Sequence, residues 1–309
     1  MHEACGIFGI YSTKEIDTFS IAQFGMFALQ HRGQEACGVS VLKGGQIRTA
    51  KKEGLVLDMF KSISDTGDFM GNAAIGHTRY STSGDSGTKN FQPFYATNAY
   101  GKVHMSFVHN GNLVDFKNVR QELIDEDFPF LGDSDSEVLL RLVQKYFDRG
   151  LVEAVKEAVK HVKGSFSVLI LTKDGMVAFR DAQGVRPLCI GKLDNETYVC
   201  CSEDAALNAI GAKFVRNVEP DTTLENIDVY KIRTESGKRL YEQSPVEADV
   251  VIGVPDSGIP SAVGYSQISG IPYEPILVKN RYMSRSFIIP TQAMRERVVN
   301  LKLNPIANQ

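Results

Sequence analysis

The sequence has 309 residues, 43% of them hydrophobic and 23% charged, and its formal net charge is −3. This balance is ordinary for a globular protein, and the lack of a basic excess argues against nucleic acid as a partner. The five cysteines include the adjacent pair Cys200–Cys201, and no apolar run approaches the roughly 20 residues that span a bilayer. We therefore expect a cytoplasmic enzyme with no disulfide framework and no membrane partner.

The first part of the chain reads as short strands around one early helix. Residues 5–11 predict a strand, residues 16–29 carry apolar side chains at helical spacing, and residues 37–42 return to strand. Further strands are predicted at 75–77 and 103–108, next to glycine-rich turns.

A helix with a clear start follows at Ser134. Ser134 and Glu137 fit a capping box, and apolar residues then recur along one face as far as Phe147. A second helix is predicted for 151–162, and strands follow at 165–172, 176–180, 188–190 and 197–201. This order predicts two antiparallel sheets covered by helices, an α+β domain that ends near Val218.

The segment beyond that domain differs in kind. Residues 250–254 form a continuous apolar run that leads into a Gly/Pro loop and a helix-like stretch. Such a run predicts a buried parallel strand of an α/β domain.

Cys5 lies almost at the start of the chain, preceded only by Met1–Ala4. Removal of those residues would put a thiol and a free α-amino group on one residue. Their ordinary pKa values are about 8.5 and about 8, so the amine can take the thiol proton near neutral pH without a histidine. A small buried thiol in an edge strand explains the same residues equally well.

Three further groups suit one ligand. Arg79 follows a strand end and can hold a carboxylate by two hydrogen bonds, although such an arginine is more often a surface ion-pair partner. Asn110 and the Gly111 N–H can form an oxyanion hole or a plain Asn-Gly turn. Asp135 can bind an ammonium group or only complement the helix dipole. With a thiol nucleophile, these groups fit an amino acid with a side-chain amide, and glutamine is the obvious candidate.

The motifs around these residues resemble those of a known family. They are CGIFGIY at 5–11, ALQHRGQEACGV at 28–39, GHTRYSTSG at 76–84, FVHNGNL at 107–113, SDSE at 134–137, KGSFSVLIL at 163–171 and RDAQGVRPL at 180–188. The chain resembles the class II glutamine amidotransferases of the N-terminal nucleophile hydrolase type, and within them the amidophosphoribosyltransferases. The resemblance implies a four-layer αββα sandwich followed by a partial α/β phosphoribosyltransferase domain.

The resemblance also implies boundaries and roles. Residues 1–4 would be a propeptide, residues 5–220 a glutaminase domain and residues 221–309 an incomplete type I phosphoribosyltransferase domain. The implied site residues are Cys5, Asn110 and Gly111 for catalysis, and Arg79, Tyr80 and Asp135 for glutamine. On the phosphoribosyl pyrophosphate side they are Asp256, Ser257, Gly258, Lys279 and Tyr282.

The implied reaction is the first committed step of purine synthesis. Glutamine is hydrolysed at Cys5, and the ammonia passes to phosphoribosyl pyrophosphate to give 5-phosphoribosylamine, pyrophosphate and glutamate. Members of the family use Mg²⁺ with phosphoribosyl pyrophosphate, and some carry an iron–sulfur cluster, for which the cysteine spacing here shows no ligand set. A homo-oligomer is also implied.

Two parts of the family pattern are missing. The main phosphoribosyl pyrophosphate loop should follow Leu303, and the join near Pro220 is compressed. We therefore expect a fragment or an internally shortened copy, which hydrolyses glutamine but forms no phosphoribosylamine.

Two other interpretations stay open. One is another class II amidotransferase, such as the glucosamine 6-phosphate synthase type, although the patterns at 254–258 and 279–282 argue against it. The other is a catalytically inactive interaction remnant, which a mature N-terminus at Met1 would favour.

Overall fold

The computed structural model describes residues 5–80, 88–98, 100–218, 229–255, 258–279, 296, 299 and 303–305. It divides into two compact units, Met1–Thr223 and Leu224–Gln309, each of which is treated by itself. Among the described residues, no helix combines the length and the apolar character that crossing a membrane would require.

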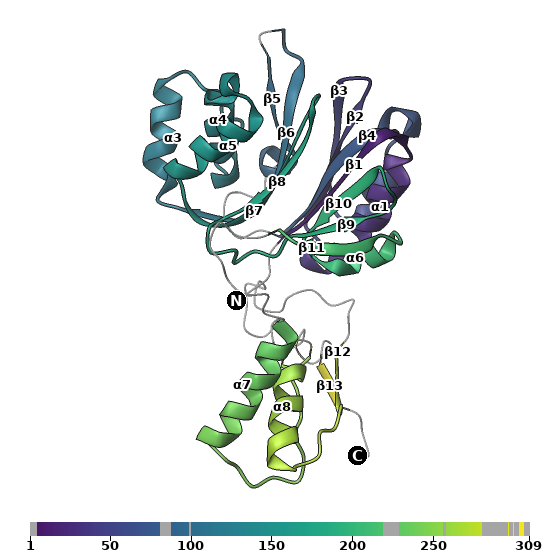
Figure 1. Ribbon diagram of the computed structural model, residues 1–309, viewed down its shortest axis with the longest axis vertical. Coiled ribbons are helices and arrows are strands. Elements are labelled where there is room, and N and C mark those ends of the chain that lie inside the picture. Colours follow the sequence, from purple (N-terminus) through teal and green to yellow (C-terminus); the bar gives the residue numbers. More distant parts are fainter. Residues whose placement is uncertain are drawn as a thin grey trace. The chain divides into compact units, whose positions relative to one another are not determined.

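The first unit contains two antiparallel sheets that face each other (Figure 1). The larger has the strand order β11-β9-β10-β1-β4-β2-β3, and the smaller has the order β5-β6-β7-β8. The strands of the larger sheet are β1 (Gly6–Ile16), β2 (Ala36–Lys43), β3 (Gln46–Glu53), β4 (Gly71–Arg79), β9 (Cys189–Lys192), β10 (Thr197–Cys201) and β11 (Lys213–Asn217). Those of the smaller are β5 (Phe94–Thr97), β6 (Val103–Val114), β7 (Lys163–Thr172) and β8 (Gly175–Arg180).

Helices cover the outer face of each sheet (Figure 1). The larger sheet carries α1 (Thr18–Ala28), α2 (Val56–Lys61) and α6 (Asp204–Ala209), and the smaller carries α3 (Phe116–Asp125), α4 (Asp135–Lys145) and α5 (Leu151–Ala158). Each helix layer shares a hydrophobic core with its sheet, and a third core lies between the sheets. The predicted four-layer αββα sandwich is therefore confirmed.

Strand alternation decides which side chains face the space between the sheets. Ile7 and Ile75 belong to the core between the sheets, whereas Phe8 packs on the helix side. Because successive side chains point to opposite faces, His77 and Arg79 share the inner face with Ile75 on β4. By the same alternation, Asn110 shares the inner face with Val108 on β6. Both strands thus bring polar residues to the inside of the sandwich.

The helix start at Asp135 is confirmed, but its capping differs from the prediction. The Ser134 hydroxyl accepts a hydrogen bond from the Ser136 N–H at 3.3 Å. The Glu137 carboxylate does not return to Ser134: it accepts from the Leu131 and Gly132 N–H groups at 3.0 and 3.1 Å. The acidic side chain therefore holds the preceding loop against the helix.

The described residues of the second unit include two helices and one pair of short strands. Its elements are α7 (Val229–Gln243), α8 (Ile259–Ser269), β12 (Leu277–Lys279) and β13 (Leu303–Pro305). The buried parallel strand predicted for 250–254 is wrong: Val251 makes one parallel bridge with Tyr273, and Ile252 and Val254 are 46% and 59% exposed. An apolar run becomes a buried strand only when neighbouring strands pair with it, and the described residues supply a single bridge.

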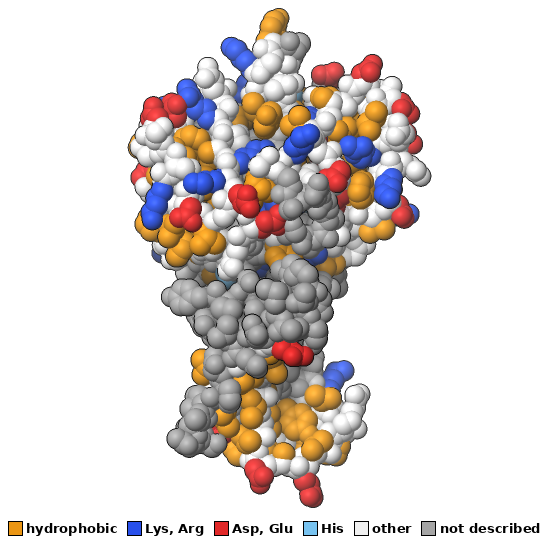
Figure 2. All heavy atoms as spheres, turned by 180° about the vertical axis from the view of Figure 1, so that it is seen from behind, with side chains coloured by type: hydrophobic (Ala, Val, Ile, Leu, Met, Phe, Trp, Pro, Cys, Tyr) orange, Lys and Arg blue, Asp and Glu red, His pale blue; other side chains and the backbone are white. Residues whose placement is uncertain are grey.

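Charged side chains of both signs are interspersed over the face of the first unit in Figure 2. This distribution agrees with the small net charge of −3.

Candidate active site

Cys5 lies directly before β1, with its thiol next to the end of β4. The Tyr80 N–H donates to Cys5 Sγ at 3.4 Å, and Sγ lies 3.4 Å from the Tyr80 carbonyl oxygen. Burial raises the pKa of the Cys5 thiol, while the Tyr80 N–H and then the guanidinium groups of Arg79, Arg32 and Arg186 act in the opposite direction. A thiol whose pKa is raised stays protonated at neutral pH, so this nucleophile needs an adjacent base.

A small, partly open cavity lies beside Cys5. Its lining residues are Cys5, His77, Arg79, Tyr80, Gln92, His109, Gly111, Ser134, Asp135 and Ser136. Five of these are candidates from the sequence, so residues from the chain start, β4, β6 and α4 meet in one place. The others escaped prediction, although His77, His109, Ser134 and Ser136 lie within the same short motifs as the candidates.

Arg79 is 5% exposed and is not a surface arginine. Its Nε donates to Glu35 Oε1 at 3.2 Å, and its Nη1 donates to the Asn90 carbonyl at 2.6 Å. Within the described part of the chain, the buried Nη2 has no hydrogen-bond partner. Two contacts thus hold the guanidinium in place, and one of its nitrogens remains for a ligand oxygen.

Asn110 and Gly111 do not form a turn, because they lie inside β6, paired with Ser167 and Phe166. Asn110 is fully buried, and neither atom of its side-chain amide has a hydrogen-bond partner among the described residues. Gly111 has a φ of 155°, and a Cβ there would collide with the Ser165 carbonyl oxygen. A buried amide without partners costs about 1–3 kcal/mol, so its presence points to a ligand that completes it.

Asp135 is buried and joins α4 to β6. Its Oδ2 accepts from the Leu113 N–H at 2.7 Å, and its Oδ1 accepts from the Ser136 N–H at 2.8 Å. Oδ1 also accepts from the hydroxyls of Ser134 and Ser136 at 3.5 and 3.4 Å, so Oδ2 is the oxygen that keeps acceptor capacity for an ammonium donor. The helix-dipole contact and the ligand role are therefore compatible.

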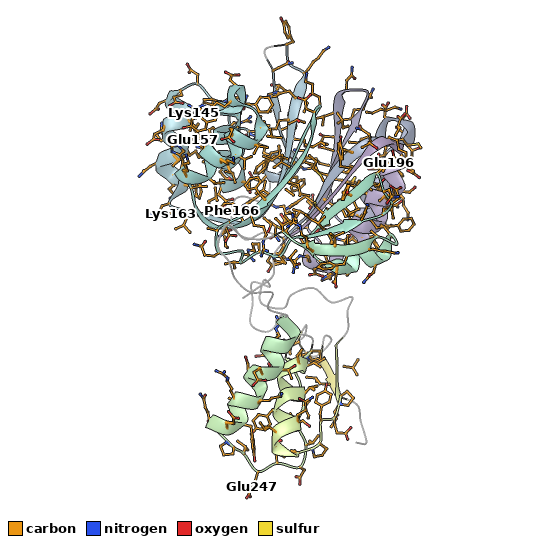
Figure 3. The ribbon with its side chains drawn as sticks, in the orientation of Figure 1. Lys145, Glu157, Lys163, Phe166, Glu196 and Glu247 are labelled. Atoms are coloured by element: carbon orange, nitrogen blue, oxygen red, sulfur yellow. The ribbon has the colours of Figure 1, made fainter. Side chains whose placement is uncertain are left out.

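His109 packs beside this carboxylate. Burial lowers its pKa, which the Asp135 carboxylate opposes, and its Nδ1 lies 2.6 Å from Ser136 Oγ. Its ring centroid lies 6.2 Å from that of Phe166 on β7. Phe166 is labelled in Figure 3. The neutral His109 imidazole, held by these contacts, lines the pocket.

Arg32 is a site residue that the sequence did not single out. It lies in a short 3₁₀ turn (Gln30–Arg32), is 1% exposed, and donates from Nε to the carbonyl oxygen of Cys5 at 2.7 Å. Its local motif contains no signal of burial, because the partners of Arg32 come from distant parts of the chain.

The candidates of the second unit are described only in part. Gly258 precedes α8 and donates its N–H to the Val254 carbonyl at 3.0 Å, and Lys279 ends β12 opposite Leu303. Asp256, Ser257 and Tyr282 lie outside the described residues. In the described ranges, no group of three His, Cys, Asp or Glu side chains is arranged to hold a metal ion.

Comparison with known proteins identifies the family of this chain. Residues 77–209 match the glutamine amidotransferase domain. The amidophosphoribosyltransferase of Synechocystis sp. is 40% identical over 98% of this chain and 69% of its own length. This chain belongs to the amidophosphoribosyltransferase family.

Solved structures agree with that assignment. The glutamine phosphoribosylpyrophosphate amidotransferase of Bacillus subtilis, complexed with ADP and GMP, superposes with a TM-score of 0.81 at 35% identity, covering 98% of this chain and 72% of that one. The amidophosphoribosyltransferase of Methanocaldococcus jannaschii is 37% identical over 98% of this chain and 74% of its own length. Amidophosphoribosyltransferases are pentosyltransferases of purine biosynthesis with glutamine amidotransferase activity, so the predicted enzyme class is confirmed.

The alignment with the Synechocystis amidophosphoribosyltransferase spans 346 positions, more than the 309 residues of this chain. That relative therefore carries positions with no counterpart here. The compressed join predicted near Pro220 lies outside the described residues and stays a prediction.

Proposed function

We propose that this chain cleaves the side-chain amide of glutamine at Cys5, the ammonia-forming half of the amidophosphoribosyltransferase reaction. One observation carries the proposal: Cys5, Arg79, Gly111 and Asp135 line a single cavity, next to the buried Asn110 amide, which has no hydrogen-bond partner among the described residues. These groups supply a nucleophile, a carboxylate partner, two oxyanion donors and an ammonium partner.

The proposed steps follow from these groups. The α-amine of a mature Cys5 takes the thiol proton, and the thiolate attacks the amide carbon of glutamine. The carbonyl electron pair moves onto the oxygen, which accepts hydrogen bonds from Asn110 Nδ2 and the Gly111 N–H. Collapse expels ammonia, which takes the proton held on the amine. Water then attacks the thioester and releases glutamate and the thiol.

Recognition of glutamine is assigned to the two buried charges of the pocket. Arg79 would hold the α-carboxylate through Nη2, and Asp135 would hold the α-ammonium. Tyr80 would help to enclose the substrate, because its backbone already contacts the thiol. Both charges are buried, so their contacts with a bound zwitterion are little screened by water.

Phosphoribosyl pyrophosphate is the proposed acceptor of the ammonia, and Mg²⁺ would bind to the enzyme together with its phosphates. Asp256, Ser257, Gly258, Lys279 and Tyr282 are the proposed contacts, on the resemblance to the family alone. No step above depends on the metal, and no iron–sulfur cluster is proposed. A homo-oligomer is proposed on the same resemblance, and light scattering of the purified chain giving a monomer mass would contradict it.

The test combines the mass of the mature chain with a glutaminase assay. We expect mass spectrometry to show the loss of Met1–Ala4, and we expect glutamine to be converted to glutamate. Cys5→Ala should abolish this conversion, while Cys37→Ala, another buried thiol outside the pocket, should retain it.

Two outcomes would contradict the proposal. A chain that retains Met1 and releases no glutamate would favour the inactive remnant, because Cys5 would then lack its own base. Normal turnover by Cys5→Ala would remove the site assignment.

A further inference from the structure

His31 and Arg32 form a turn whose two side chains converge on one carboxylate. Both lie in the Gln30–Arg32 turn, and both contact Glu203, which lies 171 residues beyond Arg32. Glu203 directly precedes α6, on the helix-covered side of the larger sheet. It does not line the cavity beside Cys5. The proposed reaction assigns no role to His31 and Arg32, and together with Glu203 they form a charged cluster outside the cavity.

Arg32 links this cluster to the nucleophile. Its Nε donates to the Cys5 carbonyl at 2.7 Å, and its Nη1 forms an ion pair with Glu203 Oε1. The methylene stem of Arg32 passes over Gly6, where a Cβ would lie 3.4 Å from Arg32 Cδ. One guanidinium thus connects the carboxylate of Glu203 to the backbone of Cys5.

The backbone next to Glu203 is also joined to the start of β1. Ser202 donates its N–H to the Ile7 carbonyl at 3.0 Å, and the Ile7 N–H donates to Ser202 Oγ at 3.0 Å. Glu203 therefore has a defined position relative to residues just beyond Cys5. A carboxylate on such a support can orient Arg32, and Arg32 can orient the Cys5 carbonyl.

His31 holds the other oxygen of the same carboxylate. Its Nε2 lies 2.9 Å from Glu203 Oε2, and its Nδ1 lies 3.0 Å from the Ala28 carbonyl oxygen. Both nitrogens face acceptors, and only the imidazolium form carries a proton on each. Glu203 raises the pKa of His31, which burial and the Arg32 guanidinium oppose, and these are the charged groups acting on His31 in the described part of the chain. The pKa of Glu203 itself is lowered to about 2, so the carboxylate is ionised at neutral pH.

We propose that Glu203 is a positioning residue for the nucleophile, acting through Arg32 on the Cys5 carbonyl, and that protonated His31 keeps Glu203 in that orientation. This inference rests on the proposed glutaminase function. In this proposal the cluster of His31, Arg32 and Glu203 affects the rate of the chemical step, and the pocket residues alone bind glutamine. The alternative is a purely structural ion pair that neutralises the buried Arg32 and has no effect on turnover.

The first experiment compares two matched glutamate substitutions in the mature full chain. Glu203→Gln retains the shape and an acceptor oxygen but removes the charge. Glu196→Gln is the control: Glu196, labelled in Figure 3, is exposed, pairs with Lys14 and directly precedes β10, whose other end leads to Glu203. We expect Glu203→Gln to lower the glutaminase kcat about tenfold, the effect of weakening one charge-assisted hydrogen bond, with KM for glutamine within about twofold. The Glu196→Gln variant should keep both constants.

The second experiment uses His31, whose half-exposed side chain can be replaced without opening the core. The glutamine side chain in His31→Gln is uncharged at every pH, as the neutral imidazole is. We expect the ratio of wild-type to His31→Gln kcat to be about two to three below the raised His31 pKa and to fall to about one as pH rises through it. The Cys5 α-amine titrates in both proteins, so its contribution cancels in the ratio.

Each outcome decides the inference. An active wild type with unchanged kcat in Glu203→Gln, or with an increase confined to KM, would overturn it. So would a pH-independent kcat ratio for His31→Gln, which remains decisive if Glu203→Gln does not fold. A wild-type chain that is processed at Cys5 but releases no glutamate would overturn the proposed function itself.

Discussion

Replacement of Asn110 by alanine should separate activity from stability. The proposed oxyanion hole loses one of its two donors in this variant. Removal of one such donor typically lowers kcat by about 10²–10³, or about 2.7–4 kcal/mol of transition-state stabilisation. The Gly111 N–H remains, so the residual turnover of Asn110→Ala should exceed that of Cys5→Ala.

The structure predicts a small effect of the same substitution on stability. Neither amide atom of Asn110 has a hydrogen-bond partner among the described residues, so alanine breaks no hydrogen bond. Removal of an unsatisfied buried polar group recovers about 1–3 kcal/mol, which offsets a similar loss of buried contacts. We expect the free energy of unfolding to change by less than about 1 kcal/mol.

Two assays and one control test this reasoning. Glutamate release gives kcat and KM, and urea unfolding gives the free energy of unfolding. The control is Asn98→Ala, because Asn98 Oδ1 accepts from the Tyr100 and Lys102 N–H groups at 3.0 and 3.1 Å in an exposed hairpin. It should lose about 1 kcal/mol of stability and keep its kcat. An Asn110→Ala variant with normal kcat, or one destabilised far more than Asn98→Ala, would refute the argument.

Three further substitutions test the buried charges. Asp135→Asn should raise KM for glutamine by about tenfold or more, because the ammonium partner becomes neutral, and an unchanged KM would remove Asp135 from the substrate site. Burial lowers the pKa of Lys51 from 10.5 to about 8, so the folded state loses this proton before the unfolded chain does, and stability should rise with pH between these values. Lys51→Met should flatten that part of the stability profile in urea unfolding. Glu137→Ala should cost about 3–5 kcal/mol of stability, because it leaves the buried Arg141 without the carboxylate that lies 2.8 Å from its Nη2.

Elements with a strong local signal were predictable from the sequence. The strand at residues 5–11, the helix near 16–29 and the helix start at Asp135 all appear, with ends that differ by a few residues. Each depends on periodicity or capping by near neighbours. By contrast, β3 and α3 were not predicted. The polar run of β3 around Lys51 becomes a strand because it pairs along its length with β2.

In the second unit, by contrast, the sequence predicted a strand that the structure does not form. Residues 250–254 have the composition of a buried strand, yet Ile252 and Val254 are largely exposed. Composition reports what a segment can bury, but only neighbouring strands decide whether it does. The described residues of that unit supply a single bridge to Val251.

The reactive groups of this protein were determined by the sequence itself. A thiol near the chain start, an arginine after a strand and an Asn-Gly pair are matters of residue type and local order, and their motifs suffice to indicate a glutamine amidotransferase. Only the tertiary structure decided which of their donors remain unsatisfied and which are already held. Arg79 is held by Glu35 and Asn90, Asn110 has no partner among the described residues, and Arg32 meets a carboxylate 171 residues away. Hydrogen-bond satisfaction depends on contacts between distant parts of the chain, so local residue patterns cannot show it.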